Sequence, residues 1–183
     1  MDRNQAIEEL KFRIKNPNMI KHSLAVEAVM MGLAKYFNED IEKWQLAGLM
    51  HDVDYEKTAD DPSKHSILGA EILENLGFDS AIVYAVKAHN SYHGIERKRK
   101  MDKALYSADP VSGLITAAAL ILPSKKLSDV SLESLLKRMN EKSFAKGADR
   151  GRIRECSEMG LSVEQFLEIA LEAMKSEAVE LGL

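Results

Sequence analysis

The chain has 183 residues, of which 45% are hydrophobic and 30% charged, and its formal net charge is −4. This composition is typical of a soluble globular protein with one buried core. The slightly acidic balance argues against a general binder of nucleic acids or membrane surfaces. No run approaches the ~18 apolar residues of a membrane-spanning helix, and the N-terminus lacks the apolar stretch of a signal peptide. We therefore expect a cytoplasmic protein with no stable nucleic-acid complex and no membrane association.

Apolar residues recur at three- and four-residue intervals along the first half of the chain, which predicts helices. The first helix should end before Asn16-Pro17, because proline disfavours helix in the residue that precedes it. Asp61-Pro62 is a helix-start signal, and Gly77 should end the helix that follows. The expected helices cover residues 3–15, 18–37, 40–53, 63–76 and 79–90.

The second half continues the helical pattern after a charged loop over residues 91–100. A helix over 101–121 contains Pro110, which should kink it and leave the carbonyl oxygen about four residues earlier without a donor. Helices over 131–140 and 162–181 follow, separated by an irregular basic stretch. No strand pattern, internal repeat or glycine-rich phosphate loop is present. The sequence predicts an all-α fold, a compact bundle of about seven to eight helices.

Four of the five histidines fall in or at the ends of successive apolar helices, with acidic residues beside or near them: His22, His51, His65 and His89. A single histidine on an apolar face is usually a hydrogen-bonded core residue, but four on successive helices call for a common explanation. The apolar helix before His51-Asp52 ends in a dense group of polar residues. Imidazole and carboxylate together are typical ligands of Zn, Mn, Fe or Co. This pattern indicates a metal site.

The order of His22, then His51-Asp52, then Asp109 resembles the HD-domain superfamily of metal-dependent phosphohydrolases. The motifs that carry the resemblance are Lys21-His22-Ser23-Leu24, Gly48-Leu49-Met50-His51-Asp52 and Tyr106-Ser107-Ala108-Asp109. It covers residues 18–122, and it implies one HD-type helical domain over 1–183, with that core and a C-terminal helical extension over 123–183. The extension should pack on the core, and a homodimer contact is the alternative.

The resemblance also implies a ligand set. His22, His51, Asp52 and Asp109 would hold one divalent ion, and His65 and His89 would hold a second, with Asp52 bridging; one ion alone is the alternative. Mn, Fe, Co, Mg, Zn and Ni all remain open. Asp52, His51 and His89 are the residues expected to carry catalysis. If the helix with Pro110 instead began at Asp109, Asp102 would replace Asp109 as a ligand.

Residues around the ligands are candidates for binding substrate or orienting the imidazoles. Asp54 and Glu56 either orient the histidines or are solvated loop acids. Basic or imidazole side chains could face a phosphate, or lie on the solvated surface. The candidates for substrate contact are Lys57, Lys64, Lys87, His93 and Arg150, the last in a basic cluster with Lys146, Arg152 and Arg154.

The function implied by the resemblance is hydrolysis of a phosphoester or phosphoanhydride bond, by attack of metal-bound hydroxide on phosphorus. A nucleotide or a similar small phosphorylated metabolite is the expected substrate. A di-iron oxygenase on the same scaffold would use the same ligands. A non-catalytic metal-binding regulatory domain is the third possibility, and loss of a ligand would be its mark.

Overall fold

The computed structural model of the chain describes residues 1–141 and 143–183, and these residues form helices and no strand. The all-α prediction is confirmed. Among the described residues, no helix has the length and apolarity needed to cross a bilayer. The helices are α1 (Arg3–Arg13), α2 (Pro17–Phe37), α3 (Ile41–Met50), α4 (Tyr55–Thr58), α5 (Ile67–Asn75), α6 (Ser80–Ala88), α7 (Lys100–Leu120), α8 (Leu132–Asn140), α9 (Arg150–Arg154), α10 (Val163–Ser176) and α11 (Ala178–Leu181), with 3-10 helices η1 (Ser91–His93), η2 (Leu127–Asp129) and η3 (Glu155–Met159).

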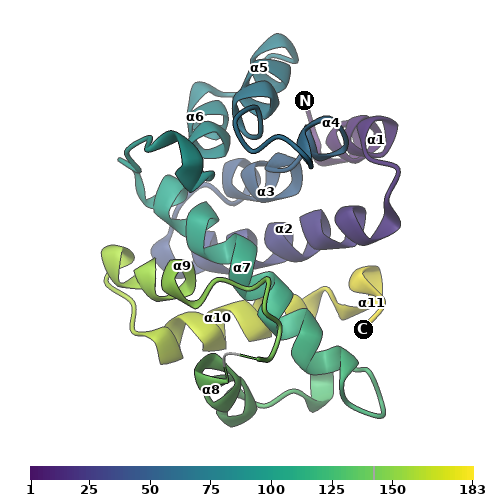
Figure 1. Ribbon diagram of the computed structural model, residues 1–183, viewed down its shortest axis with the longest axis vertical. Helices are drawn as coiled ribbons and strands as arrows, with labels where there is room; N and C mark the ends of the chain where they lie inside the picture. Colours follow the sequence, from purple (N-terminus) through teal and green to yellow (C-terminus); the bar gives the residue numbers. More distant parts are fainter. Residues whose placement is uncertain (142) are drawn as a thin grey trace.

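Helix α2 lies across the middle of the molecule (Figure 1). Helices α3, α5 and α6 lie on one side of it, and α8 and α10 lie on the other. Helix α7 runs diagonally past both groups and contacts α2, α3, α6, α8, α9 and α10. Segments from both halves of the chain therefore meet along α2 and α7.

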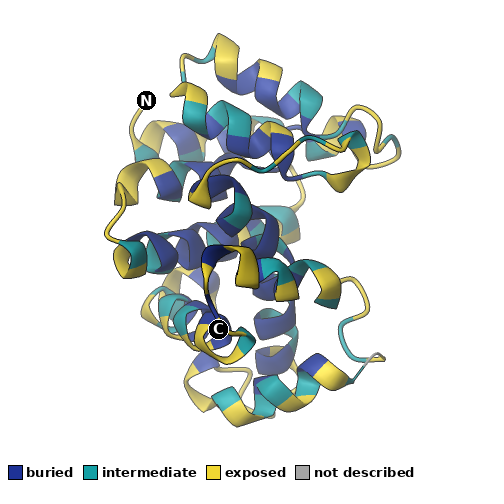
Figure 2. Cartoon of the chain, turned by 90° about the vertical axis from the view of Figure 1, so that its left-hand side faces the viewer, coloured by how far each residue is buried: buried dark blue, intermediate teal, exposed yellow. Residues whose placement is uncertain are grey.

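One continuous hydrophobic core joins these helices. Its fully buried members range from Leu10 in α1, through Leu49 in α3 and Leu105 in α7, to Phe166 in α10. Figure 2 shows the buried positions facing inward, with exposed residues on the outer faces and in the connecting loops. The predicted core and the C-terminal segment thus share the same apolar interior.

The helix starts follow the local sequence. The Asn16 side chain accepts a hydrogen bond from the backbone N–H of Asn18, and Pro17 occupies the first turn, where its missing N–H costs nothing. Asp40 caps α3 in the same way through the N–H of Lys43. Asn38 ends α2 in the left-handed conformation, at φ 55°.

Several expected boundaries differ from the structure. The third helix ends at Met50 instead of 53, because His51 to Asp54 form turns that aim polar groups inward. The fourth begins at Ile67 instead of 63, after Ser66 takes a positive φ of 71°. The expected helix over 162–181 divides after Ser176, and α4 and α9 are additional short helices. At the start of α5 the cause is tertiary, because the backbone N–H of Ser66 donates to the Asp54 side chain.

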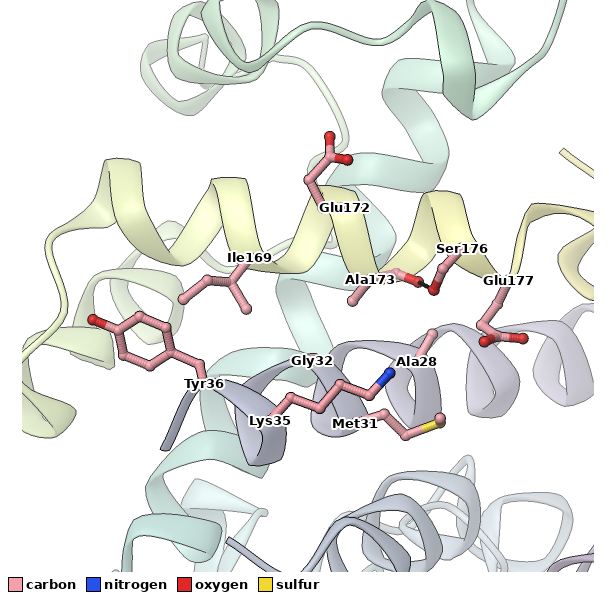
Figure 3. A pocket seen from close by; sticks show the side chains of 10 residues that line it. All are labelled: Ala28, Met31, Gly32, Lys35, Tyr36, Ile169, Glu172, Ala173, Ser176 and Glu177. Atoms are coloured by element: carbon pink, nitrogen blue, oxygen red, sulfur yellow. Dashed lines mark hydrogen bonds between the residues drawn. The ribbon is translucent and has the colours of Figure 1, made fainter. Parts of the chain in front are cut away.

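Two glycines let helices approach α2 closely. A Cβ atom at Gly48 would lie 2.8 Å from the Cα of Glu27 and 2.9 Å from its backbone nitrogen. A Cβ atom at Gly32 would lie 2.6 Å from the Cβ of Ala173 on α10. Figure 3 shows this second close approach. Helix α10 runs beside α2, and a groove of about 330 Å³ lies between them.

Replacing Gly48 with alanine should destabilise the protein by about 1–3 kcal/mol, because the added methyl group meets backbone atoms of α2, which cannot move aside. Urea unfolding followed by circular dichroism measures the change. Gly113→Ala is the matched control, since a Cβ atom there meets nothing within 4 Å and α7 gains helix propensity. Equal stability of the two variants would show that the α2–α3 crossing is not tightly packed.

Candidate metal centre

The carboxylate of Asp52 lies at the centre of four imidazole rings. Oδ2 is 3.4 Å from Nε2 of His51 and 3.8 Å from Nε2 of His22. Oδ1 is 3.4 Å from the Nε2 atoms of both His65 and His89. Each carboxylate oxygen thus faces two imidazole nitrogens that come from different helices or turns.

Hydrogen bonds fix the two most buried rings. Nδ1 of His51 donates to the carbonyl oxygen of Gly48 at 2.9 Å, and Nδ1 of His89 donates to that of Val86 at 2.6 Å. Because a carbonyl oxygen only accepts, Nδ1 of each ring carries a proton, and in the neutral form of either ring Nε2 carries the lone pair. Both Nε2 atoms are buried without a hydrogen-bond partner in the described structure.

The other two rings are also held through Nδ1. Nδ1 of His65 donates to Oδ1 of Asp54 at 3.0 Å. The hydroxyl of Ser112 donates to the carbonyl oxygen of Asp109 at 2.8 Å, so its oxygen is free to accept from Nδ1 of His22, 3.3 Å away. Oδ1 of Asp109 lies 3.2 Å from Nε2 of His22. All four rings therefore turn Nε2 inward.

Burial and charge set the protonation of the cluster. Burial lowers the pKa of His51 to about 4, so its ring is neutral. Burial by itself would raise the pKa of Asp52, but the surrounding imidazoles outweigh it and the pKa ends below its ordinary value. Burial would likewise raise the pKa of Asp109, yet the hydrogen bond from His22 and the charge of Arg152 lower it. The result is two carboxylates beside the neutral ring of His51, and those carboxylates in turn raise the pKa values of His22 and His65 against the effect of burial.

These donors suit divalent cations. His22, His51 and Asp52 bring ligand atoms within 4.8 Å of one another, and so do Asp52, His65 and His89. A buried imidazole nitrogen without a partner is costly, and a bound ion removes that cost. In such sites, histidine ligands donate their other ring N–H to a carbonyl or carboxylate, as His51, His65 and His89 do here.

The sequence profile of the HD domain matches residues 19–140. The chain belongs to the HD-domain family. HD domains generally are phosphohydrolases that bind divalent metals, and the His/Asp cluster here could hold such a metal.

Curated relatives share part of this HD domain. Ribonuclease Y of Lawsonia intracellularis is 31% identical over 126 residues, which cover 67% of this chain and 22% of the relative. Ribonuclease Y of Nitratidesulfovibrio vulgaris is 29% identical over 106 residues, 57% of this chain and 20% of the relative. An uncharacterized protein of Methanocaldococcus jannaschii is 33% identical over 94 residues, 49% of this chain and 54% of the relative. The matched region spans about a fifth of the Ribonuclease Y chains.

The acids expected beside the ligands of the HD domain have different roles. Asp54 is buried and accepts hydrogen bonds from His65 and from the backbone N–H groups of Ser66 and Gly69, so it fixes both the ring and the start of α5. Glu56 instead accepts from the backbone N–H groups of Lys15 and Asn16, and it joins the α1–α2 loop to α4. Of the two roles considered for Glu56, the structure does not show that of orienting an imidazole, and its side chain is exposed.

The three lysines predicted to contact substrate are exposed, and none of them contacts the metal centre in the described structure. Lys64 is exposed and pairs with Asp61 at 2.8 Å. Lys87 is exposed and lies with Glu71 and Glu74 along the groove between α5 and α6. Lys57 is exposed on α4. Their contact with substrate stays a prediction that the structure does not support.

His93 and Arg150 both bind backbone atoms. Nε2 of His93 donates to the carbonyl oxygen of His65 at 2.9 Å, so the ring supports a ligand-bearing loop. The guanidinium of Arg150 donates to four carbonyl oxygens, those of residues 138, 144, 145 and 148. It therefore organises the segment before α9, and the structure does not bring it to the metal centre.

Arg152 reaches the centre, although within its basic cluster only Arg150 was expected to contact substrate. Nη2 donates to Oδ2 of Asp109 at 2.8 Å and to the carbonyl oxygen of Tyr106 at 3.0 Å, and the carbonyl oxygen of His89 lies 3.4 Å away. The guanidinium also stacks on the Tyr106 ring, 4.3 Å from its centroid. Arg152 therefore links the C-terminal segment to two ligand-bearing helix segments.

Pro110 explains why Arg152 can bind there. Helix α7 continues through Pro110, whose missing N–H leaves the Tyr106 carbonyl without its helical donor. The expectation that this carbonyl would stay unpaired is wrong, because Arg152 donates to it. The alternative ligand Asp102 is also excluded: the helix begins at Lys100, and Asp102 accepts from the backbone N–H groups of Lys98 and Arg99.

Replacing Asp52 with alanine should weaken binding of divalent metal by more than about 100-fold, since loss of an outer hydrogen-bond partner of a ligand alone costs about 10–100-fold. Isothermal titration with Mn²⁺ measures the affinity, and circular dichroism verifies the fold. Asp60→Ala removes an exposed carboxylate of the loop after α4 and serves as the control. Unchanged metal affinity in the Asp52 variant would contradict the assignment.

Replacing Arg152 with methionine should weaken metal binding by about 10–100-fold, because Asp109 loses the partner that holds its second oxygen. The same titration with Mn²⁺ tests this. Arg154→Met is the control, since the Arg154 side chain donates to the carbonyl oxygen of Arg150 and not to Asp109. A result in which both variants keep wild-type affinity would remove Arg152 from the metal centre.

Proposed function

We propose that this HD domain hydrolyses a phosphoester or phosphoanhydride bond of a small phosphorylated compound, with two divalent ions held on either side of Asp52. The observation that supports the proposal best is the pairing of each Asp52 oxygen with two inward-facing Nε2 atoms. One ion would bind His22, His51, Asp52 and Asp109. The other would bind His65, His89 and Asp52.

Two such ions, when bound, supply positive charge for the phosphoryl oxygens and lower the pKa of the attacking water. Asp52 would hold the spacing between them. Asp52 and Asp109 are the carboxylates that would face the ions, so the loaded site would keep a net positive charge and favour an anionic substrate.

His51 and His89 serve this reaction as ligands and not as proton donors. In each ring, Nδ1 donates to a backbone carbonyl oxygen and Nε2 faces the position of the ion. Neither nitrogen is then free to exchange a proton with substrate. Arg152 holds Asp109 in place, and Asp54 holds His65.

A nucleotide is the substrate class that we favour. Ribonuclease Y, the name of several relatives, denotes an enzyme that acts on RNA, so a phosphodiester between nucleotides belongs among the candidate bonds. The cluster also contains every ligand of the family pattern, which favours an enzyme over a non-catalytic regulatory domain.

The test is an activity panel on metal-stripped protein reloaded separately with Mn, Co, Fe, Mg, Zn or Ni. Substrates are nucleoside monophosphates, dinucleoside polyphosphates, cyclic nucleotides and a short oligoribonucleotide. We expect release of product with at least one metal, and a fall of more than about 1,000-fold in kcat/KM for Asp52→Ala, equivalent to about 4 kcal/mol of transition-state stabilisation. Oxygen uptake by the iron form without phosphate-bond cleavage would favour the oxygenase alternative instead.

A further inference from the structure

A cavity of about 460 Å³ opens directly beside the metal centre, between α2, α7 and residues 181–183. Its volume lies in the range of sites for small organic ligands. His22 belongs both to its lining and to the metal centre. We call this cavity the α2–α7 pocket.

The wall formed by α7 continues the face that carries Asp109. Gly113, Thr116, Ala117 and Leu120 line the pocket, and they follow Asp109 at helical spacings that place them on one face. With a rise of ~1.5 Å per residue, this face extends from about 6 to about 16 Å beyond Asp109 along the helix. The four residues are partly or fully exposed, whereas the intervening residues are buried. A ligand whose phosphate lies at the metal centre would therefore have its organic part along this wall.

The opposite wall shows the same continuity. On α2, Asn18 lies one turn before His22 and Ala25 lies about one turn after it, and both line the pocket. His22 therefore lies within this wall, and its Nε2 is 3.2 Å from Oδ1 of Asp109, the residue from which the α7 wall extends. The pocket is an extension of the centre and not a separate hollow on the surface.

We propose that the α2–α7 pocket binds the organic part of the substrate, an uncharged and largely flat group of nucleoside size, and that Gly113 determines which group fits. This inference rests on the proposed function for the placement of the phosphate. The small side chains of Ala25, Gly113 and Ala117 leave room for a flat ring. The Asn18 amide and the Thr116 hydroxyl can hydrogen-bond to its polar edges, which is the mixture of apolar wall and few polar groups found in ligand sites.

The groove between α2 and α10 is a poorer place for a phosphorylated compound (Figure 3). Its lining includes the carboxylates of Glu172 and Glu177, which repel an anion. None of the residues that line it belongs to the metal centre. Each cavity has one lysine in its lining, Lys35 in the groove and Lys21 in the α2–α7 pocket, but among the described residues no Asp or Glu side chain lines the α2–α7 pocket.

Gly113→Leu tests the proposal. A Cβ atom at this position meets no heavy atom within 4 Å, so the larger side chain should fill the pocket without disturbing the core. Gly147→Leu is the matched control, since a Cβ atom there also meets nothing within 4 Å and the residue does not line the pocket. The probes are the four ribonucleosides, which carry no phosphate, and inorganic phosphate, which has no organic part. Binding of each to the Mn²⁺-loaded protein is followed by isothermal titration.

We expect at least one nucleoside to bind the wild-type protein and Gly147→Leu, and to bind Gly113→Leu at least 10-fold more weakly. Phosphate should bind all three proteins alike and should need the metal. If Gly113→Leu proves unfolded by circular dichroism, Ala117→Leu fills the same pocket from the next turn. No nucleoside binding to wild type, or equal binding to a folded pocket-filling variant, would overturn the proposal. Failure of phosphate to bind, with nucleoside binding still sensitive to residue 113, would instead count against the proposed function alone.

Discussion

The structure depends on one buried carboxylate, that of Asp52, surrounded by imidazole rings from several helices. An ionised carboxylate inside a protein is stable only where compensating groups surround it. Here these groups come from α2, the end of α3, the turn before α5 and the end of α6. The relative positions of these segments are therefore tied to a single side chain.

Gly48 shows how packing and chemistry share one residue. Its missing Cβ atom allows α3 to approach the backbone of α2 at Glu27, and its carbonyl oxygen accepts the proton on Nδ1 of His51. The first contact brings the helix of His22 close to the helix that ends at His51. The second turns Nε2 of His51 toward Asp52. The approach of two helices and the orientation of a ligand thus have a common origin.

Pro110 has a comparable double effect in the second half of the chain. By removing one helical hydrogen bond, it leaves the Tyr106 carbonyl oxygen able to accept from Arg152. The same guanidinium nitrogen then donates to Asp109, one residue before the proline. The missing helical hydrogen bond of α7 is thus where the C-terminal segment contacts the metal centre. The hydroxyl of Ser107 adds to this contact by donating to the Arg152 carbonyl oxygen.

Local sequence was sufficient for most helices and for the ligands carried by motifs. Helical periodicity and cap residues depend on neighbours a few positions away, so the ranges of α2, α6 and α7 could be predicted to within a few residues. The His-Asp pair and its spacing to His22 and Asp109 identified the family, which the match over residues 19–140 confirms. The turn before α5 could not be predicted, because the backbone of Ser66 is held by Asp54, a residue on another segment.

The basic residues depended wholly on tertiary structure. Arg150 and Arg152 stand two positions apart in the same charged stretch, and nothing in their local sequence separates them. In the fold, Arg150 binds carbonyl oxygens of its own segment, while Arg152 meets Asp109 from 43 positions away.

The sequence by itself determined which residue types are able to bind metal and on which helices they lie. Only the tertiary structure decided which charges meet them, because a charged side chain interacts with whatever the fold brings within a few ångströms, whether near or far in the chain.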